Sequence, residues 1–213
     1  MKIVPFNPDT LREAVDVLKK GGVIAHPTDT CYGLAADVMN PKAVKNVQAI
    51  KGRDYKKPMS IMISVPEQLR IEKYVVLDEF SKFIVHKLFP GAVTLLLPKG
   101  PMIPTAYFPE TPFIGLRVPM HDSTQDILRA FGGPLITTSA NPSGDPLCFN
   151  CEEVAEGFKN RANQPDLVIE GKIARHGKAS TVIKVESDHV YIIRKGPITA
   201  SQLEGILGID VKE

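Results

Sequence analysis

The chain has 213 residues, 43% of them hydrophobic and 23% charged, and its formal net charge is +2 with histidine neutral. These proportions are those of an ordinary globular protein, and no apolar run approaches the roughly 20 residues that a membrane helix needs. The N-terminus also lacks the charged and apolar segments of a secretory signal. We therefore expect one cytoplasmic domain spanning residues 1–213, with no membrane association.

The chain has three cysteines, an odd number in a sequence without an export signal, which indicates reduced thiols. Cys148 and Cys151 are spaced as CxxC, yet a structural zinc needs two more ligands and no second cysteine pair exists. The five histidines show no metal-binding spacing. We therefore interpret the thiols as incidental and expect no protein-held metal.

Helical and extended patterns alternate from the N-terminus onward. Apolar residues recur at helical spacing before a glycine pair, which predicts a helix over 9–20, and the apolar run at 22–25 predicts a strand. Asn40 then provides an N-cap and Pro41 the first position of a second helix. This helix leads through a polar loop to the apolar run Met59–Val65.

The rest of the chain continues this alternation. Further helices are predicted at 78–89, 122–131, 151–160 and 198–207, and further strands at 93–98, 114–119, 134–140, 166–171, 180–185 and 190–196. Strands interleaved with helices predict an α/β fold with a twisted open mixed β-sheet flanked by helices.

Polar side chains gather where several predicted strands begin or end. The stretch HPTDTCYGL, residues 26–34, follows the first predicted strand, and TTSANPSG, residues 137–144, closes another. Arg117 and Arg194 belong to two further strands. Ligands of open α/β sheets bind in crevices formed by loops at strand ends. These clusters can therefore converge on one binding site.

The densest cluster of cations follows the second predicted helix and comprises Lys51, Arg53, Lys56 and Lys57. Lysine and arginine are usually exposed, so an ordinary solvated loop is one interpretation. The other is a loop that gathers several cations around one polyanion, because Gly52 allows a sharp turn and Pro58 fixes the entry to the next strand.

Two further features each allow a structural and a functional interpretation. The turn at 137–144 offers small donors and backbone amides to an anion, or Ser139 and Asn141 satisfy the backbone of their own turn. Arg117 lies in an otherwise apolar strand, and a buried guanidinium must be paired. Its partner is either a structural carboxylate or the carboxylate of a ligand. Arg194 raises the same question.

Common motifs for phosphate binding, covalent catalysis and metal-dependent catalysis are missing from the sequence. No Walker-type GxxxxGK(S/T), GxGxxG, GxSxG or HExxH pattern occurs. His26 lies near the candidate site, but no nucleophile is evidently paired with it. We therefore interpret His26 as a packing or hydrogen-bonding residue, and covalent catalysis has little support.

Taken together and in order, seven segments resemble the YrdC-like family of threonylcarbamoyl-AMP synthases. They are GGVIAHPTDTCYGLAAD, KGRDYKKPMSIMI, FPGAVTLLL, IGLRVP, TTSANPSG, STVIKV and IIRKG, and the likeness runs from about residue 10 to residue 200. The resemblance implies a single YrdC-like domain without an additional C-terminal domain. It implies an enzyme that joins L-threonine, bicarbonate or CO2 and ATP, with Mg²⁺, into threonylcarbamoyl-adenylate and pyrophosphate. A partner transferase then uses this product to modify tRNA to threonylcarbamoyladenosine.

The resemblance also implies roles for single residues. Lys51 and Arg53 are then catalytic, ATP is bound by Arg53, Lys57, Ser139, Asn141 and Arg194, and threonine is bound by Thr30, Arg117, Thr137 and Ser180. In this arrangement Arg117 holds the substrate carboxylate. The carbamate formed on threonine attacks the α-phosphorus of ATP, so no enzyme nucleophile is needed. Positioning and charge neutralisation supply such catalysis.

One position departs from the family pattern. Where many members carry a histidine near the threonine, this chain has Met62, a feature of the YciO-like branch. It motivates an alternative, a YciO-like paralogue that forms an adenylate with a different acyl or carbamoyl acceptor. A third hypothesis is a double-stranded RNA or tRNA-binding protein without catalysis. The sequence favours it least, because tryptophan is absent and the densest cations coincide with the expected nucleotide site.

Overall fold

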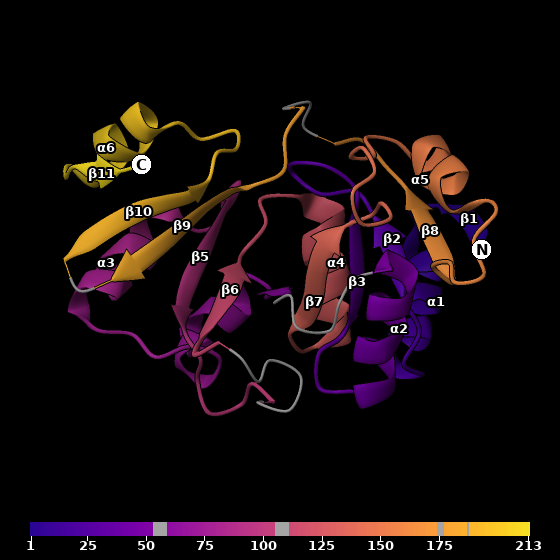
Figure 1. Ribbon diagram of the computed structural model, residues 1–213. Coiled ribbons are helices and arrows are strands. Elements are labelled where there is room, and N and C mark those ends of the chain that lie inside the picture. Colours follow the sequence, from indigo (N-terminus) through magenta and orange to yellow (C-terminus); the bar gives the residue numbers. More distant parts are fainter. Residues whose placement is uncertain (53–58, 105–110, 174–176, 187) are drawn as a thin grey trace.

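The computed structural model describes residues 1–52, 59–104, 111–173, 177–186 and 188–213. In this part of the chain an 11-stranded sheet crosses the molecule in the order β1-β8-β2-β3-β7-β4-β6-β5-β9-β10-β11 (Figure 1). The sheet is mixed, because it contains parallel pairs such as β4 with β6 and antiparallel pairs such as β3 with β7. The strands are β1 (Lys2–Pro5), β2 (Ile24–His26), β3 (Gly33–Asp37), β4 (Ser60–Met62), β5 (Val93–Pro98), β6 (Phe113–Arg117), β7 (Leu135–Ser139), β8 (Leu167–Glu170), β9 (Thr181–Glu186), β10 (His189–Arg194) and β11 (Val211–Lys212).

Helices flank this sheet along its length, and the two termini lie at its opposite ends, beside β1 and β11 (Figure 1). The helices are α1 (Pro8–Lys19), α2 (Pro41–Lys51), α3 (Glu79–Leu88), α4 (Asp122–Phe131), α5 (Cys151–Phe158) and α6 (Ala200–Leu207), with the 3-10 helix η1 (Pro66–Lys73). The predicted α/β fold with an open mixed sheet is thereby confirmed. Within the described ranges, no helix is both long and apolar enough to cross a membrane.

Local signals fix the ends of α2. The side chain of Asn40 accepts a hydrogen bond from the amide of Lys42 at 3.0 Å, and Pro41 occupies the first turn. Proline suits that position because the first amides of a helix have no partner within the helix. The helix stops at Gly52, whose φ of 58° lies in the left-handed region that favours glycine. These signals determine where Lys51, the last residue of α2, is placed.

Alternating residues of the central strands contribute to two hydrophobic clusters. Along β3, Leu34 and Ala36 belong to the larger cluster and Ala35 to the smaller one. Helices α2, α3, α5 and α6 add buried residues to the larger cluster, whereas α1 and α4 cover the smaller one. Because successive side chains of a strand point to opposite faces, the two clusters lie on opposite sides of the central strands.

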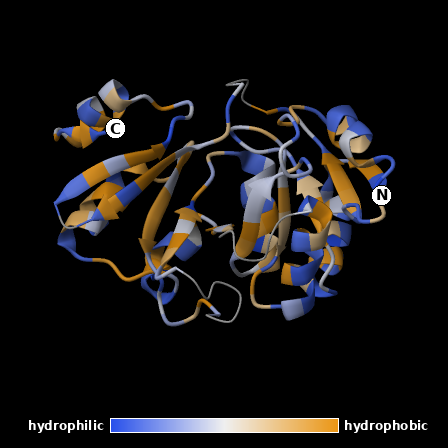
Figure 2. Ribbon diagram, viewed as in Figure 1, coloured by the Kyte–Doolittle hydropathy of each residue, from blue (hydrophilic) through white to orange (hydrophobic). Residues whose placement is uncertain are grey.

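The hydropathy of strand β7 falls along its length, from hydrophobic (orange) to nearly neutral (white) in Figure 2. Its first residue, Leu135, is fully buried in the smaller cluster together with Ile127 and Leu128 of α4. Its last three residues, Thr137 to Ser139, carry hydroxyl groups and are half-buried. The face of the sheet that α4 covers at one end of β7 is therefore open and polar at the other.

Four elements of the structure were missing from the sequence-based expectations: β1, β3, η1 and β11. Strand β3 contains Gly33, Ala35 and Ala36, which have little intrinsic preference for strands. It forms because it pairs with β2 on one side and β7 on the other. β1 and β11 are short edge strands that pair with β8 and β10.

Candidate functional site

A cavity of about 470 Å³ lies across the open face of the middle strands. Residues of β3, β7, β4, β6, β5, β9 and β10 line it, together with the end of α2. Cross-strand register brings these distant residues together. The register partners that cross the cavity are Gly33 with Ser139, Thr137 with Ser60, Thr94 with Val182, and Val182 with Arg194.

The loop between β2 and β3, residues 27–32, is held by its own hydrogen bonds. Thr28 Oγ1 donates to the main-chain oxygen of Cys31 at 2.6 Å and accepts from the amide of Thr30 at 3.1 Å. The buried Tyr32 hydroxyl lies 3.0 Å from both the amide and the oxygen of Gly171, which anchors the loop to the chain beyond β8. These contacts fix Thr30 at the wall of the cavity.

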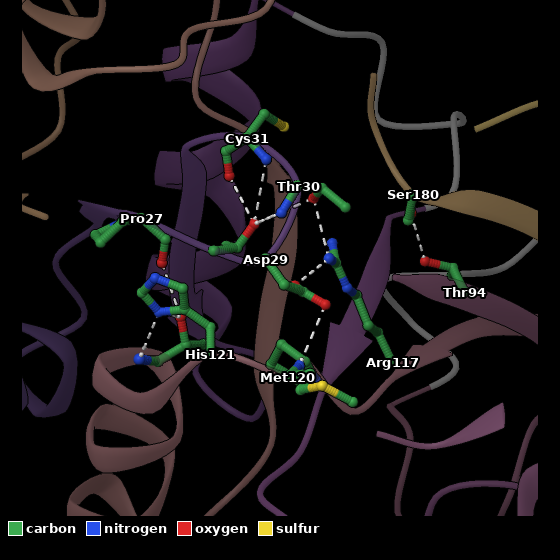
Figure 3. Close-up of polar contacts among 12 residues, drawn as sticks. Pro27, Asp29, Thr30, Cys31, Thr94, Arg117, Met120, His121 and Ser180 are labelled. Carbon is green, nitrogen blue, oxygen red and sulfur yellow. Dashed lines mark hydrogen bonds and ion pairs between the residues drawn. The ribbon is translucent and has the colours of Figure 1, made fainter. Parts of the chain in front are cut away.

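Arg117, the last residue of β6, is paired with a carboxylate of the protein itself. Its Nη2 donates to Oδ1 of Asp29 and, at 3.0 Å, to Oγ1 of Thr30 (Figure 3). Oδ2 of Asp29 accepts from the amide of Met120 at 3.2 Å. Asp29 and Arg117 are each only 6% exposed. The arginine thus has the structural partner that was one of the two sequence-based alternatives, and it also lines the cavity.

The directions of these hydrogen bonds leave the guanidinium of Arg117 as the donor at this end of the cavity. Arginine only donates, so Thr30 Oγ1 accepts from Arg117, and it gives its own proton to Thr28 Oγ1 at 3.1 Å, since Thr28 donates to the oxygen of Cys31. The Nε of Arg117 is buried and has no hydrogen-bond partner among the described residues. Because a carboxylate only accepts hydrogen bonds, it is the kind of group that this end of the cavity suits.

Lys51 holds the turn that follows β7. Its Nζ donates to the main-chain oxygens of Ser139 and Asn141, at 2.8 and 2.5 Å, and lies 3.0 Å from Oδ1 of Asn141. The amide of Ser143 donates back to the Lys51 oxygen at 2.8 Å. Lys51 is only 4% exposed. A lysine that was expected to act on the substrate is therefore bonded to the loop that carries Ser139 and Asn141.

The turn at 137–144 does not present a continuous row of free amides. The amides of Ala140, Ser143 and Asp145 donate to main-chain oxygens of the protein. The side-chain nitrogen of Asn141 donates to the oxygen of Asp145 at 2.5 Å. The side chain of Asn141 therefore hydrogen-bonds the backbone of its own turn, which is the structural alternative given above. The residue also lines the cavity.

Thr94 and Ser180 form another part of the cavity wall. Their hydroxyl oxygens lie 2.8 Å apart beside Arg117 (Figure 3). Arg194, at the end of β10, donates from Nη2 to the oxygen of Ser180 at 2.9 Å and to its Oγ at 3.1 Å. Arginine can only donate, so Ser180 Oγ accepts from Arg194. Of the two hydroxyl protons of Ser180 and Thr94, one is used in the hydrogen bond between them, and the other remains for a ligand. This wall therefore adds another donor.

All predicted site residues in the described part of the chain line this one cavity: Thr30, Lys51, Arg117, Thr137, Ser139, Asn141, Ser180 and Arg194. The expectation that separate polar clusters converge is confirmed. Arg53 and Lys57, which the sequence placed at the ATP, lie outside the described residues together with Lys56 and Pro58.

Several residues of the site were not predicted. Thr94 sits within the apolar run VTLLLP, and its lone hydroxyl at an alternating position is a signal that was available. Asp29 lies in the quoted stretch at 26–34, but the sequence does not show which cation it contacts. Gly115 has a steric role, because a Cβ there would lie 2.3 Å from Oγ of Ser60. Its missing side chain leaves room for Ser60, which lines the cavity.

Met62 and His26, the two residues singled out near the predicted site, are both buried. Met62 is 1% exposed and packs in the smaller cluster with Ile127, Leu128 and Leu135, and it is not among the cavity-lining residues. His26 is fully buried, its Nδ1 lies 2.9 Å from the oxygen of Pro27, and burial lowers its pKa to about 3. His26 is therefore a packing and hydrogen-bonding residue, as expected.

The three cysteines are buried free thiols. Burial raises the pKa of Cys31 and raises those of Cys148 and Cys151 to about 11. A thiol with a raised pKa is a weak nucleophile at neutral pH, because the thiolate is the reactive form. In the described ranges, no group of three or more His, Cys, Asp or Glu side chains is placed to hold a metal ion.

Comparison with known proteins agrees with this fold and site. Residues 16–196 match the Sua5/YciO/YrdC family model, which is described as "Telomere recombination". A protein of Methanocaldococcus jannaschii named "Putative threonylcarbamoyl-AMP synthase" is 35% identical over 95% of this chain and 95% of its own length. The chain belongs to the Sua5/YciO/YrdC family.

Three further comparisons agree with this membership. A threonylcarbamoyl-AMP synthase of Pyrococcus abyssi is 29% identical over 93% of this chain, which spans 57% of that protein. The crystal structure of P. abyssi Sua5 complexed with L-threonine is similar with a TM-score of 0.88 and 28% identity, over 100% of this chain and 62% of the other. The structure of E. coli YciO is similar with a TM-score of 0.77 and 26% identity, over 92% and 94% of the two chains.

Proposed function

We propose that the chain is a threonylcarbamoyl-AMP synthase, a nucleotidyltransferase that makes threonylcarbamoyl-adenylate and pyrophosphate from L-threonine, CO2 or bicarbonate and ATP. The observation that carries the proposal is the meeting, in one cavity, of the Arg117 guanidinium with the Lys51-held turn and Arg194. Relatives named for this activity, and a structural neighbour crystallised with L-threonine, support it.

In this proposal Arg117, Thr30, Thr137 and Ser180 bind threonine. The amine of threonine adds to the carbon of CO2 and loses a proton, which gives a carbamate. A carbamate oxygen then forms a bond to the α-phosphorus of ATP, and the bond from that phosphorus to the pyrophosphate oxygen breaks. The chain needs to align these groups and to balance their negative charge, and alignment alone is worth about 10⁵ M or more in effective concentration.

ATP is proposed to lie along the turn at Ser139 and Asn141 and against Arg194, with Arg53 and Lys57 as further cations. Mg²⁺ is proposed as part of the nucleotide substrate, where it neutralises phosphate charge. The described residues offer no carboxylate cluster of their own for the ion. Lys51 shapes the nucleotide end of the site through the turn that it holds.

The test is pyrophosphate release by the purified chain with Mg-ATP, L-threonine and bicarbonate. We expect release to require all three substrates and the adenylate to appear in equal amount. Release that does not depend on threonine or bicarbonate contradicts the proposal. We further propose that a cytoplasmic transferase consumes the adenylate, a reactive mixed anhydride, to modify tRNA. Transfer to tRNA by an added transferase fraction tests that step.

A different acceptor is the second candidate, and the likeness to YciO over nearly both whole chains favours it. Met62 gives this candidate less support than the sequence suggests, because it packs in the smaller cluster and does not line the cavity. Replacing threonine in the same assay by serine, valine and other small carboxylates separates the two candidates. Preference for threonine supports the synthase, and a strong preference for another compound supports the alternative.

A further inference from the structure

We propose that Asp29 is a positioning residue that reserves Arg117 for a carboxylate and keeps phosphate groups away from the amino-acid end of the cavity. The inference rests on the proposed function, which places an amino acid and a triphosphate side by side. Such a site must keep the two substrates apart, because both carry negatively charged groups that the same buried guanidinium can attract.

Asp29 holds Arg117 from one side only. The hydrogen bonds that the Arg117 side chain makes with other described residues come from Nη2, which donates to Asp29 and Thr30. The Nε of the same guanidinium is buried and has no partner. Asp29 is itself fixed, because its second oxygen accepts from the amide of Met120. The contact therefore orients the guanidinium, which belongs to a cavity-lining residue and has donors that Asp29 does not use (Figure 3).

Asp29 also sets the charge at this end of the cavity. The side chains of Asp29 and Arg117 are each 8% exposed, so water screens them weakly, and together they carry no net charge. Without Asp29, Arg117 is a buried cation that attracts the most highly charged anion available, which is the triphosphate. With Asp29 in place, a phosphate is repelled by the carboxylate, whereas a singly charged carboxylate can still be recognised through hydrogen bonds.

Lys51 and Arg194 are the other described cations of the cavity lining. Lys51 Nζ is bonded to main-chain and side-chain oxygens of the turn after β7, and Arg194 to Ser180. Arg117 lines the cavity, whereas its ion-pair partner Asp29 is buried and is not among the lining residues. At the amino-acid end, the charge of the lining arginine is thus balanced by a carboxylate of the protein.

The test measures L-threonine binding by calorimetry, without turnover, in the presence of increasing inorganic phosphate. For the unmodified chain we expect a threonine Kd that phosphate leaves unchanged. For Asp29→Asn we expect threonine binding to weaken by about tenfold or more, which corresponds to about 1.4 kcal/mol, and the threonine Kd to rise in proportion to phosphate. Competition of this kind is a readout that a loss of folding alone does not produce.

Two control variants test whether the phosphate competition arises from the unpaired Arg117. Asp126→Asn removes the same charge from an Asp–Arg pair on the exposed side of α4, with Arg129 at 2.6 Å, and should leave the threonine Kd insensitive to phosphate. The double variant Asp29→Asn with Arg117→Met removes the cation as well and should abolish the phosphate competition. If Asp29→Asn does not fold, Asp29→Glu keeps the charge but shifts the carboxylate, and should weaken threonine binding without phosphate competition.

The proposal is overturned if Asp29→Asn binds threonine as tightly as the unmodified chain and remains insensitive to phosphate, or if Asp29→Glu gains phosphate competition. Failure of the proposed function has a different signature. In that case the unmodified chain does not bind threonine, while direct titration of phosphate still shows whether Asp29→Asn gains an Arg117-dependent anion site.

Discussion

The Nζ of Lys51, at the end of α2, lies 2.8 Å from the main-chain oxygen of Ser139, at the end of β7. Since the same Nζ also contacts Asn141, one side chain fixes the turn on which two predicted ATP contacts sit. Lys51 thus acts on the site through its neighbours, and its removal should displace them together.

We expect Lys51→Met to lower the free energy of unfolding by about 2 kcal/mol, because buried carbonyl groups lose their donor. Displacement of the turn should lower kcat about a hundredfold, as small misplacements of binding groups can. Lys45 lies on the exposed side of the same helix, so Lys45→Met is the matched control and should change neither quantity. Urea unfolding and steady-state pyrophosphate release measure the two effects. Full activity of Lys51→Met contradicts this role.

Because the hydroxyls of Thr94 and Ser180 are hydrogen-bonded, we expect threonine binding to depend on whether residue 94 keeps its hydroxyl. Thr94→Val has nearly the same shape but removes the hydroxyl 2.8 Å from Ser180, so the KM for threonine should rise about five- to tenfold, near 1 kcal/mol. Thr94→Ser keeps the hydroxyl and should stay close to the unmodified chain. Equal KM values for the two variants contradict the hydrogen bond's role.

Two glycine substitutions should have opposite effects on stability. A Cβ at Gly196 would lie 2.2 Å from the amide nitrogen of Thr181 and 2.6 Å from the oxygen of Ala179, both main-chain atoms. Gly196→Ala should therefore destabilise the protein by about 2 kcal/mol or more and disturb the cavity wall at Ala179 and Ser180.

Gly205 is the matched control for this substitution. It lies within α6, and a Cβ there meets no other atom within 4 Å. Gly205→Ala should stabilise the protein by about 0.5–1 kcal/mol, because alanine loses less conformational entropy in a helix. Thermal unfolding of both variants gives the comparison, and a stabilised Gly196→Ala variant would show that the close approach is not as described.

His26 predicts how stability depends on pH. Burial lowers its pKa to about 3, so it is neutral in the folded protein, whereas in the unfolded chain it takes up a proton near pH 6.5. The unfolded state thus binds more protons between these values, and the contribution of His26 to stability falls as the pH falls. Between pH 7.5 and pH 5 this loss is about 2 kcal/mol.

The variant His26→Asn tests this dependence, because asparagine keeps a donor near the position of Nδ1 but does not titrate. Its free energy of unfolding, measured in urea, should be lower at neutral pH but should fall by about 2 kcal/mol less between pH 7.5 and pH 5. A pH dependence equal to that of the unmodified chain would assign the proton uptake to other groups.

The sequence alone determined the helices and most strands, because these depend on local signals. The Asn40 cap, the Pro41 start and the Gly52 stop of α2 are all readable within a dozen residues. Strand β3 was not readable, since Gly33, Ala35 and Ala36 become a strand only when β2 and β7 pair with them. The sequence also predicted several residues that line the cavity, such as Thr30 and Ser180, but not Thr94.

Only the tertiary structure decided what those residues contact. Whether Arg117 meets a protein or a ligand carboxylate depends on Asp29, which is 88 positions away in the chain. Lys51 carries a charge that suggests catalysis, but its partners Ser139 and Asn141 come from a distant strand end. Residue type sets the chemistry that a side chain can perform. Its partners are set by sheet register and loop packing, which are long-range properties that no local pattern of residues encodes.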